Sequence, residues 1–411
     1  MFKNTVFSFS LKVLSAVVGF CINYVLLDKL ELVATDRLFF LMAIASIFRT
    51  VIDYGFNTLI LRENIRSENA YKKNKLITYV HIWGICVCLT ILSFMYFIIP
   101  IFNIEVSISV LLLLIVNTFF LVSINWMSSN LQSHDFTKTS AVFYECLYQV
   151  IVLILLLIVA VDLVGVLKIY LISSVVVLFL VFLVSFKLKT YTAVVIRGNF
   201  NLGFINASTS FFIVVFISAI SANINQIIIG LNELEEGALS AYSISLKLSI
   251  SMSFILIIIS KIISPKLSFY YKNKKFIEVI NLYKKSSMFT IIIALPIALI
   301  FLFGAEFILG FFGDSLAKYS DILKLMIFAQ IANCVTGPLA ALLNMVGYEK
   351  HVRNVVVFFS LLSITTSFFI IPLFGVYAAA WIFFISMVGQ NVTLFYIYNK
   401  FGKVHLLGYM K

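Results

Sequence analysis

Long apolar segments recur from one end of this chain to the other, and they constrain its fold more than any other feature. Twelve can be traced, at 5–27, 38–61, 76–99, 107–130, 139–161, 166–186, 204–230, 239–260, 286–304, 322–346, 354–371 and 376–399. Crossing a bilayer takes roughly 20 mainly apolar residues. Inside lipid the backbone must satisfy its own hydrogen bonds, and these segments lack the alternation of barrel strands. The sequence therefore predicts an all-α integral membrane protein with about twelve transmembrane helices.

Composition excludes the soluble classes. Hydrophobic residues make up 62% of the 411 residues and charged residues only 12%, whereas soluble domains carry about 25% charged residues. The five cysteines all lie within apolar segments, which gives no basis for a disulfide or metal framework. Nucleotide-binding, zinc-protease and serine-hydrolase motifs are missing. We therefore expect no enzyme and no cofactor.

The charges predict the orientation. If the N-terminus is placed on one side, the loops on that side collect 22 Lys and Arg and those on the other side collect five. Acidic residues run the other way, five against eleven. Cytoplasmic loops carry the basic excess, so both termini are predicted to be cytoplasmic. The net charge of +12 then needs no nucleic-acid partner.

An internal repeat suggests two halves. Residues 22–27 and Glu31 align with residues 224–229 and Glu233 at a constant offset. Such an offset, with six segments on each side, is typical of two parallel bundles. We predict an N-lobe at 1–190 with spans 1–6, a cytoplasmic linker at 191–203 and a C-lobe at 204–411 with spans 7–12.

Charged residues inside the spans are the first candidates for function, because a charge in lipid is costly. They are Lys12, Arg49, Asp53, Glu145 and Lys247. Asp53 is one helical turn after Arg49, so the two could simply neutralise each other. The basic residues outnumber the acidic ones, which favours an anionic substrate such as a phosphate. Asp53 and Glu145 are candidates for ion coupling.

Neutral polar residues within the spans, among them Asn225 and Gln226, could bind sugars or form interhelical hydrogen bonds. Pro296 and Gly337-Pro338 predict kinks. The lysine-rich segment 261–285 is predicted to be an amphipathic cytoplasmic connector lying on anionic headgroups, with an acidic partner as the alternative.

Several motifs in order resemble those of a known family. They are 31–63 with its Asp53-Tyr54-Gly55 element, 234–266 with Glu235-Glu236-Gly237 and Lys247-Leu248, 343–350, and 371–380 from Ile371-Pro372 onward. The chain is similar to the polysaccharide transporters of the MOP (MATE-like) superfamily, specifically Wzx-type O-antigen flippases. The resemblance covers nearly the whole chain.

That resemblance implies a bacterial inner-membrane protein of two six-helix lobes around a central cavity. It would carry undecaprenyl-diphosphate-linked oligosaccharide from the cytoplasmic to the periplasmic leaflet by alternating access, for O-antigen or another surface polysaccharide. By helix position Lys12, Arg49 and Lys247 would hold the diphosphate. Na⁺ or H⁺ are candidate coupling ions, and membrane lipid and other polysaccharide-assembly proteins are candidate partners.

Three other functions stay open at this point. A cation-coupled multidrug exporter of the same superfamily would prefer an acidic interior to a basic one. A membrane glycan polymerase or glycosyltransferase would need catalytic carboxylates on a long outer loop, and the longest outer loop spans about 17 residues at 305–321. A membrane scaffold without transport would have no use for five charges inside its spans.

Overall fold

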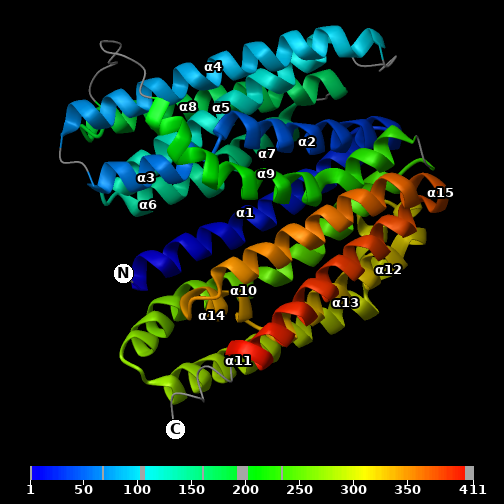
Figure 1. Ribbon diagram of the computed structural model, residues 1–411. Helices are drawn as coiled ribbons and strands as arrows, with labels where there is room; N and C mark the ends of the chain where they lie inside the picture. Colours follow the sequence, from blue (N-terminus) through cyan, green and yellow to red (C-terminus); the bar gives the residue numbers. More distant parts are fainter. Residues whose placement is uncertain are drawn as a thin grey trace. The chain divides into compact units, whose positions relative to one another are not determined.

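The structure, a computed structural model, describes residues 2–66, 69–101, 107–159, 162–191, 202–232 and 235–402. Throughout these ranges every regular element is a helix (Figure 1). The chain divides into two compact units, Met1–Ala219 and Ile220–Lys411. The boundary falls inside α9 (Leu202–Leu231). Most of the predicted linker, 192–201, lies outside the described residues.

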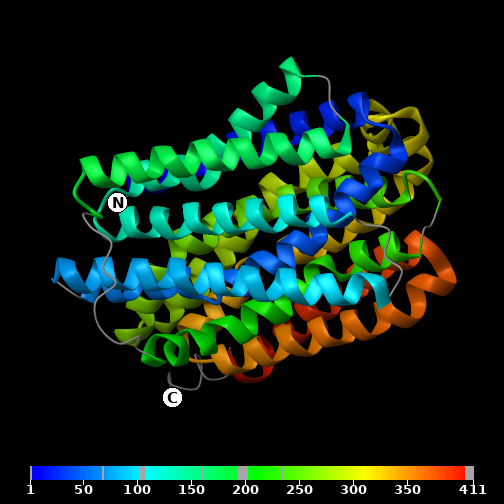
Figure 2. The same cartoon turned by 90° about the horizontal axis from the view of Figure 1, so that it is seen from above.

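The first unit contains eight helices and one π-helical turn before α9. They are α1 (Phe2–Lys29), α2 (Leu32–Asp53), α3 (Phe56–Arg66), α4 (Ala70–Ile101), α5 (Ile108–Ser133), α6 (Thr137–Ala141), the π-turn η1 (Val142–Leu147), α7 (Tyr148–Ile158) and α8 (Leu163–Lys187). In both views the helices of this unit run roughly side by side (Figures 1 and 2).

The described part of the second unit is also built from helices. Its elements after α9 are α10 (Ala238–Lys272), α11 (Phe276–Phe303), α12 (Ala305–Phe312), the 3₁₀ turn η2 (Asp314–Tyr319), α13 (Ser320–Thr336), α14 (Leu339–Met345), α15 (Glu349–Ile397) and the π-turn η3 (Tyr398–Gly402). One apolar cluster, which includes Leu267, Val279, Leu342 and Leu343, joins α10, α11 and α14.

Hydropathy and helix length confirm the membrane class. Eleven described segments are long and apolar enough to cross a bilayer. The last, Glu349–Lys400, has 52 residues, more than twice the roughly 20 that one crossing needs. Gly375 interrupts its helix with φ 71° and ψ −159°. Division there gives the predicted spans 354–371 and 376–399, and twelve crossings in all.

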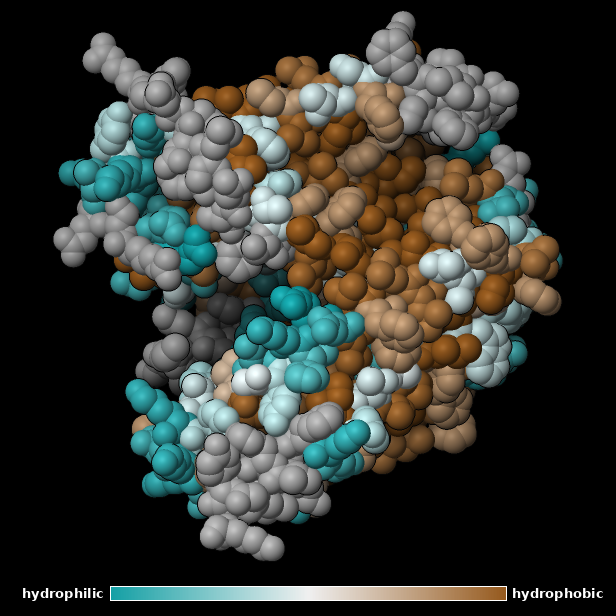
Figure 3. Space-filling model, in the orientation of Figure 1, coloured by the Kyte–Doolittle hydropathy of each residue, from teal (hydrophilic) through white to brown (hydrophobic). Residues whose placement is uncertain are grey.

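The exposed surface of the helices is apolar, as lipid contact requires. Large hydrophobic side chains such as Phe303 and Leu373 are 88% and 77% exposed. Figure 3 shows one face, on which brown hydrophobic residues form a broad continuous area and teal hydrophilic residues form separate patches. A water-soluble protein would not expose such a surface. The chain is a multi-pass membrane protein.

Two predicted boundaries were wrong. The segment 261–285 is not a separate connector, because α10 continues to Lys272 and α11 begins at Phe276. Polar residues after Ser260 lower the local hydropathy, which is why the predicted span ended there. They do not end the helix, because Lys, Ser and Tyr all tolerate helical geometry. The second correction concerns segment 38–61, which breaks at Tyr54-Gly55 instead of forming one helix.

Three of the five basic residues on the less basic side have bonding partners within their own unit. Lys29 Nζ donates to the carbonyls of Leu156 and Val159 at 2.6 Å and 3.0 Å, where it caps the C-terminal end of α7. Of these three residues, Lys318 pairs with Glu235 at 3.1 Å, and Lys324 pairs with Asp321 at 2.8 Å. These exceptions to the charge bias therefore have local reasons. The orientation of the termini stays a prediction.

Candidate functional site

The second span of the first unit is broken inside the membrane. Tyr54 and Gly55 both have positive φ, 47° and 76°, and they separate α2 from α3. A tyrosine is strained in this conformation. Its ring stacks on Phe212 with centroids 4.3 Å apart, and its hydroxyl lies 3.2 Å from Thr209 Oγ1. These contacts fix the break in place.

Asp53 satisfies the backbone at this break. Its Oδ1 accepts a hydrogen bond from Trp126 Nε1 at 2.7 Å and another from the backbone N–H of Asn57 at 3.3 Å. Asn57 lies in the first turn of α3, whose N–H groups have no partner within the helix. A carboxylate is favourable there, because it also meets the positive end of the helix dipole. Asp53 therefore has a structural task beside its predicted coupling role, which stays a prediction.

Arg49 lies one turn before Asp53 and is only half-buried. The guanidinium is close enough to Asp53 for electrostatic attraction. Over the described ranges, however, it forms no ion pair or hydrogen bond. The alternative in which Arg49 and Asp53 neutralise one another stays a prediction, because their attraction persists without a direct ion pair. The five N–H donors of Arg49 remain available to an anion.

Glu145 lies inside the π-turn η1, and its side chain is half-buried. Extra turns of this kind occur mostly as single bulges in α-helices and are frequent at functional sites. On the neighbouring α1, Lys12 is also half-buried. The first unit therefore holds Arg49, Asp53, Lys12 and Glu145, four of the five predicted intramembrane charges.

The fifth, Lys247, lies on α10 of the second unit. It is nine residues after Ala238, or about 13 Å along the helix at 1.5 Å per residue. Its side chain is exposed although residues 238–246, 248 and 249 are buried. An ammonium at such a depth is costly against hydrocarbon. This favours a wet face of α10 and keeps Lys247 a candidate anion-binding residue.

Asn225 is used inside the second unit. It is 4% exposed, and its Nδ2 donates to Tyr242 Oη at 2.8 Å and to the Ala379 carbonyl at 3.2 Å. Ser367 Oγ donates to its Oδ1 at 2.5 Å. Both amide hydrogens are taken and the group is buried, so this conformation offers no sugar-binding amide here. Asn225 instead joins α9, α10 and both halves of α15.

The neighbouring Gln226 is less enclosed. Its Nε2 donates to Ser243 Oγ at 3.0 Å, and the side chain is half-buried. The predicted sugar-binding role therefore stays a proposal for Gln226 alone.

The second unit has its own break, between α13 and α14. Gly337 has φ 64° and ψ −152°, and Pro338 lacks an N–H group. A neutral group satisfies the broken end, because Tyr283 Oη donates to the Thr336 carbonyl at 2.8 Å. The Thr336 side chain also ties the break to α15, since its Oγ1 donates to Asn391 Oδ1 at 2.8 Å. The kink predicted from Gly337-Pro338 is confirmed. Pro296, by contrast, lies within the continuous α11.

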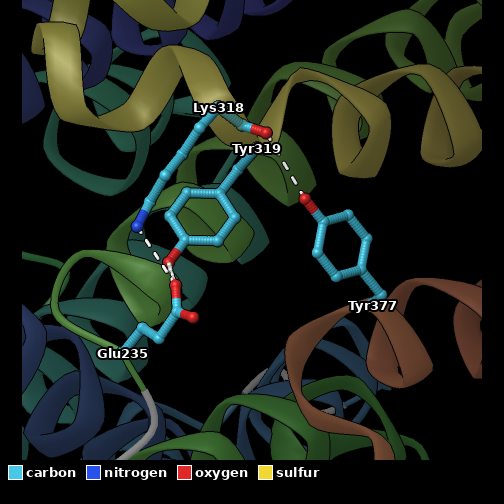
Figure 4. A network of polar contacts seen from close by, with 4 residues as sticks. All are labelled: Glu235, Lys318, Tyr319 and Tyr377. Atoms are coloured by element: carbon cyan, nitrogen blue, oxygen red, sulfur yellow. Dashed lines mark hydrogen bonds and ion pairs between the residues drawn. The ribbon is translucent and has the colours of Figure 1, made fainter.

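A polar network lies at one end of the second unit (Figure 4). Glu235 Oε2 accepts from Lys318 Nζ at 3.1 Å and from Tyr319 Oη at 3.0 Å, and Tyr377 Oη donates to the Lys318 carbonyl at 3.3 Å. The bonds from Lys318 and Tyr319 hold the pKa of Glu235 below its usual range. The sequence resemblance singled out Glu235, but its exposed side chain is already paired with Lys318. The network ties η2 to the start of α10 and to α15.

No group of three or more His, Cys, Asp or Glu side chains that could hold a metal occurs in the described ranges. The five cysteines are free thiols. The side chains that the structure does offer are basic and amide groups, which suit an anion and a polar ligand.

Comparison with known proteins decides the family. The model of the "Polysaccharide biosynthesis protein" family (Polysacc_synt_3) matches residues 38–321, more than half of the chain. The chain belongs to this family. None of the curated protein sequences matches it.

Solved structures show the same fold. A lipid II flippase, MurJ, in an inward closed conformation superposes with a TM-score of 0.79 at 14% identity, covering 97% of this chain and 89% of that one. An inward-facing multidrug resistance MATE transporter of the MOP superfamily gives 0.76 at 11% identity, with 98% of each chain covered. A variant of the Vibrio cholerae MATE transporter VcmN gives 0.64 at 13% identity, covering 97% and 95%.

The predicted fold class is therefore confirmed. The similar structures are of transporters and a flippase, and the family is one of polysaccharide biosynthesis. Family and fold together support a transporter or flippase and not an enzyme. A multi-pass protein of this kind is consistent with the inner membrane.

Proposed function

We propose that this protein flips undecaprenyl-diphosphate-linked oligosaccharide repeat units from the cytoplasmic to the periplasmic leaflet, for O-antigen or another surface polysaccharide. One observation carries the proposal. Arg49 is an arginine in a membrane span that has an aspartate one turn away and yet forms no ion pair among the described residues. Charged groups within spans face the bundle interior or a water-filled cavity and mark substrate or ion pathways.

The chemistry of the ligand follows from the donors. Arginine presents a planar fork of N–H groups that matches two phosphate oxygens at once, and lysine adds a point charge. Lys12 supplies this charge from α1 in the first unit, and Lys247 on α10 is the basic candidate of the second unit taken by itself. A diphosphate on a lipid provides the several negative oxygens that these groups need. Gln226 is proposed to bind sugar hydroxyls.

Transport follows by alternating exposure of these residues to the two sides of the membrane. No nucleotide is needed, since the chain has no motif for one. Membrane potential provides about 2.3 kcal/mol per charge per 100 mV, and Na⁺ or H⁺ are further candidate energy sources. The prenyl tail is proposed to stay in the bilayer while the polar head crosses.

The test is complementation of a deletion strain with verified expression of each variant. We expect R49A and K247A to leave repeat units on the cytoplasmic leaflet, measured by whether a membrane-impermeant oxidant reaches the glycan in spheroplasts. R49K should recover only part of the activity, because it loses the two-oxygen contact. The matched control is K324A, a lysine that pairs with Asp321 at 2.8 Å and should behave as wild type.

Full surface glycan in both R49A and K247A would refute the proposed site. A deletion strain that accumulates no lipid-linked repeat units, but becomes sensitive to cationic compounds, would favour the multidrug exporter instead.

A further inference from the structure

A lysine and a histidine meet at the end of the first unit that the charge bias predicts to be cytoplasmic. Lys73 lies in the first turn of α4, and His134 directly follows α5. Lys73 Nζ is 3.5 Å from His134 Nε2, and both side chains are half-buried. Most hydrogen bonds in proteins measure about 2.7 to 3.2 Å, so this contact is a weak one. The ammonium and the imidazole therefore lie together with little bonding between them.

The other ring nitrogen of His134 determines where the imidazole carries its hydrogen. His134 Nδ1 lies 2.9 Å from the Asn130 carbonyl. A carbonyl can only accept, so Nδ1 is the nitrogen that carries the hydrogen. Nε2 of the neutral ring is then an acceptor, and it faces the Lys73 ammonium. When the ring takes up a proton, Nε2 becomes a second donor beside Lys73.

The groups behind the imidazole are buried and hold it in place. Asn130 is fully buried, and its side-chain amide donates to the Thr190 carbonyl at 3.1 Å and accepts from Asn64 Nδ2 at 2.9 Å. Ser133 Oγ donates to the Asn130 carbonyl at 2.7 Å. These bonds join α3, α5 and the segment that follows α8. The imidazole is thus preorganised, as a precise binding site requires.

The charges around this pair are mainly basic. Within the described part of the chain, Lys73 and His134 join no ion pair with an acidic group. The other charged and titratable groups that are described near this level are Arg62 and Glu63 on α3, which pair with each other, Tyr71, Lys72 and Lys75 on α4, Asp135 after α5, Lys138 on α6, and Lys187, Lys189 and Tyr191 at the end of α8. Basic groups outnumber acidic ones, which favours an anion.

We propose that Lys73 and His134 form a phosphate-binding site at this end of the first unit, separate from Arg49. One anionic oxygen of the phosphate accepts from the Lys73 ammonium. A second accepts from Nε2 after His134 has taken up one proton from water. The proposal does not depend on the proposed flippase activity, because it uses no residue assigned to that activity.

The position of the pair indicates where such a phosphate comes from. Lys73 precedes the predicted span 76–99, and His134 follows the predicted span 107–130. Both therefore lie at the edge of the apolar layer, where the phosphates of anionic lipid headgroups are found. Free phosphate has the same oxygens and the same negative charge. The tests below distinguish these two sources.

The first measurement follows the imidazole itself. Full-length protein labelled with ¹⁵N-histidine is purified in a non-ionic detergent, and the ring signals of His134 are identified by their absence in H134N. The probe is dihexanoyl phosphatidylglycerol, a short lipid whose phosphodiester carries one negative charge throughout the pH range used. Near neutral pH the probe should increase the fraction of His134 rings protonated at both nitrogens, since anion binding and proton uptake are linked. K73Q should show a much smaller increase.

The second measurement is the affinity for the same lipid in mildly acidic and mildly alkaline solution, by titration calorimetry. All proteins carry R49Q, so that Arg49 does not contribute. Binding should be tighter in acid, because His134 then donates a charge-assisted hydrogen bond. K73Q should bind about tenfold more weakly, the change expected from one such contact. H134N keeps a donor near the position of Nδ1 but lacks Nε2, so it should lose the pH dependence.

Lys72→Gln is the matched control. Lys72 is exposed and directly precedes Lys73, so K72Q removes the same charge from a different side of α4. It should keep the affinity and the pH dependence of the unchanged protein. Equal losses in K72Q and K73Q would show that the lipid is attracted by diffuse charge, and would overturn the proposed site.

Inorganic phosphate, added in place of the lipid, separates the two sources. It should change the His134 ring as the lipid does if the site binds free phosphate, and should leave the ring unchanged if the site binds a lipid headgroup. The proposal is overturned if neither probe changes the protonation of His134, or if K73Q binds the lipid as tightly as the unchanged protein. Lys73 makes no other side-chain bond among the described residues, so K73Q decides the question even if H134N folds poorly.

Discussion

The two units each contain one helix broken inside the membrane, but they break different helices and close the breaks with different chemistry. The first unit breaks its second span at Tyr54-Gly55 and leaves its fourth, α5, continuous over 26 residues. The second unit breaks its fourth span at Gly337-Pro338 and leaves its second, α10, continuous over 35 residues. The two units therefore place their breaks in different spans.

The chemistry of the breaks differs as well. Asp53 caps the break in the first unit, with Arg49 one turn away. In the second unit the Tyr283 hydroxyl satisfies the free Thr336 carbonyl, and the Thr336 hydroxyl bonds Asn391, without any charge. A break in a membrane helix therefore does not require an ion. Arg49 makes no bond at the break and needs another reason, and we infer that anion binding is that reason.

Gly337→Ala should give the largest loss of stability. The conformation of Gly337 is one that only glycine adopts easily, and a Cβ there would collide with Ser287. Strain and overpacking together should cost about 4 kcal/mol. The measurement is the midpoint of thermal denaturation in detergent. G347A is the matched control, since Gly347 also has positive φ but no atom within 4 Å of an added Cβ.

Equal losses in G337A and G347A would show that backbone strain alone matters. The combined variant S287G/G337A should recover part of the loss. If it recovers none, the close approach to Ser287 does not constrain the break.

Asp53→Ala should give the next largest effect, about 3 kcal/mol, because it leaves the Trp126 indole N–H and the Asn57 backbone N–H without an acceptor. Asp53→Asn keeps an acceptor oxygen, so we expect it to cost less than half as much. Thermal denaturation of the two variants side by side measures the difference. Equal losses would mean that the charge, and not the hydrogen bonds, holds the first break.

Thr336→Val tests the neutral break in the second unit. The substitution keeps the shape but removes the bond to Asn391, and it should cost about 1 kcal/mol. The same denaturation assay applies. A loss as large as that of D53A would contradict the view that the second break depends less on any single polar group.

Glu235→Gln should have the smallest effect, because the network of Figure 4 is exposed. The pKa of Glu235 is held low, so its contribution is present at neutral pH and is lost as the pH falls through the lowered pKa. Wild type should be slightly more stable than E235Q near neutrality, and the two should converge in acid. A difference that grows in acid would contradict the assigned bonds.

Hydropathy alone was enough to predict the class, the spans and the division at Gly375, because lipid requires long apolar helices. The break at Gly337-Pro338 was also predictable, since proline lacks the N–H that a helix uses. The break at Tyr54-Gly55 was not, because apolar residues continue through it and its strained tyrosine depends on Phe212 far along the chain.

The sequence was enough to choose the candidate residues but not to predict how they are arranged. Arg49, Lys12, Glu145 and Lys247 stand out as charges in apolar segments. That Glu145 lies in a π-turn, or that Asn225 is taken up by Ser367 and Ala379, depends on contacts between distant segments. Hydropathy did not predict that α10 continues past Ser260, because hydropathy indicates which residues lie in lipid and not where a helix ends.

The most direct test of anion binding is reconstitution of the purified protein into liposomes with a fluorescent prenyl-diphosphate oligosaccharide in both leaflets. A membrane-impermeant quencher then reports how fast the label exchanges between them. We predict exchange with wild type and with K324A, and a rate near that of empty liposomes for the double variant R49Q/K247Q. Undiminished exchange by R49Q/K247Q would contradict the account.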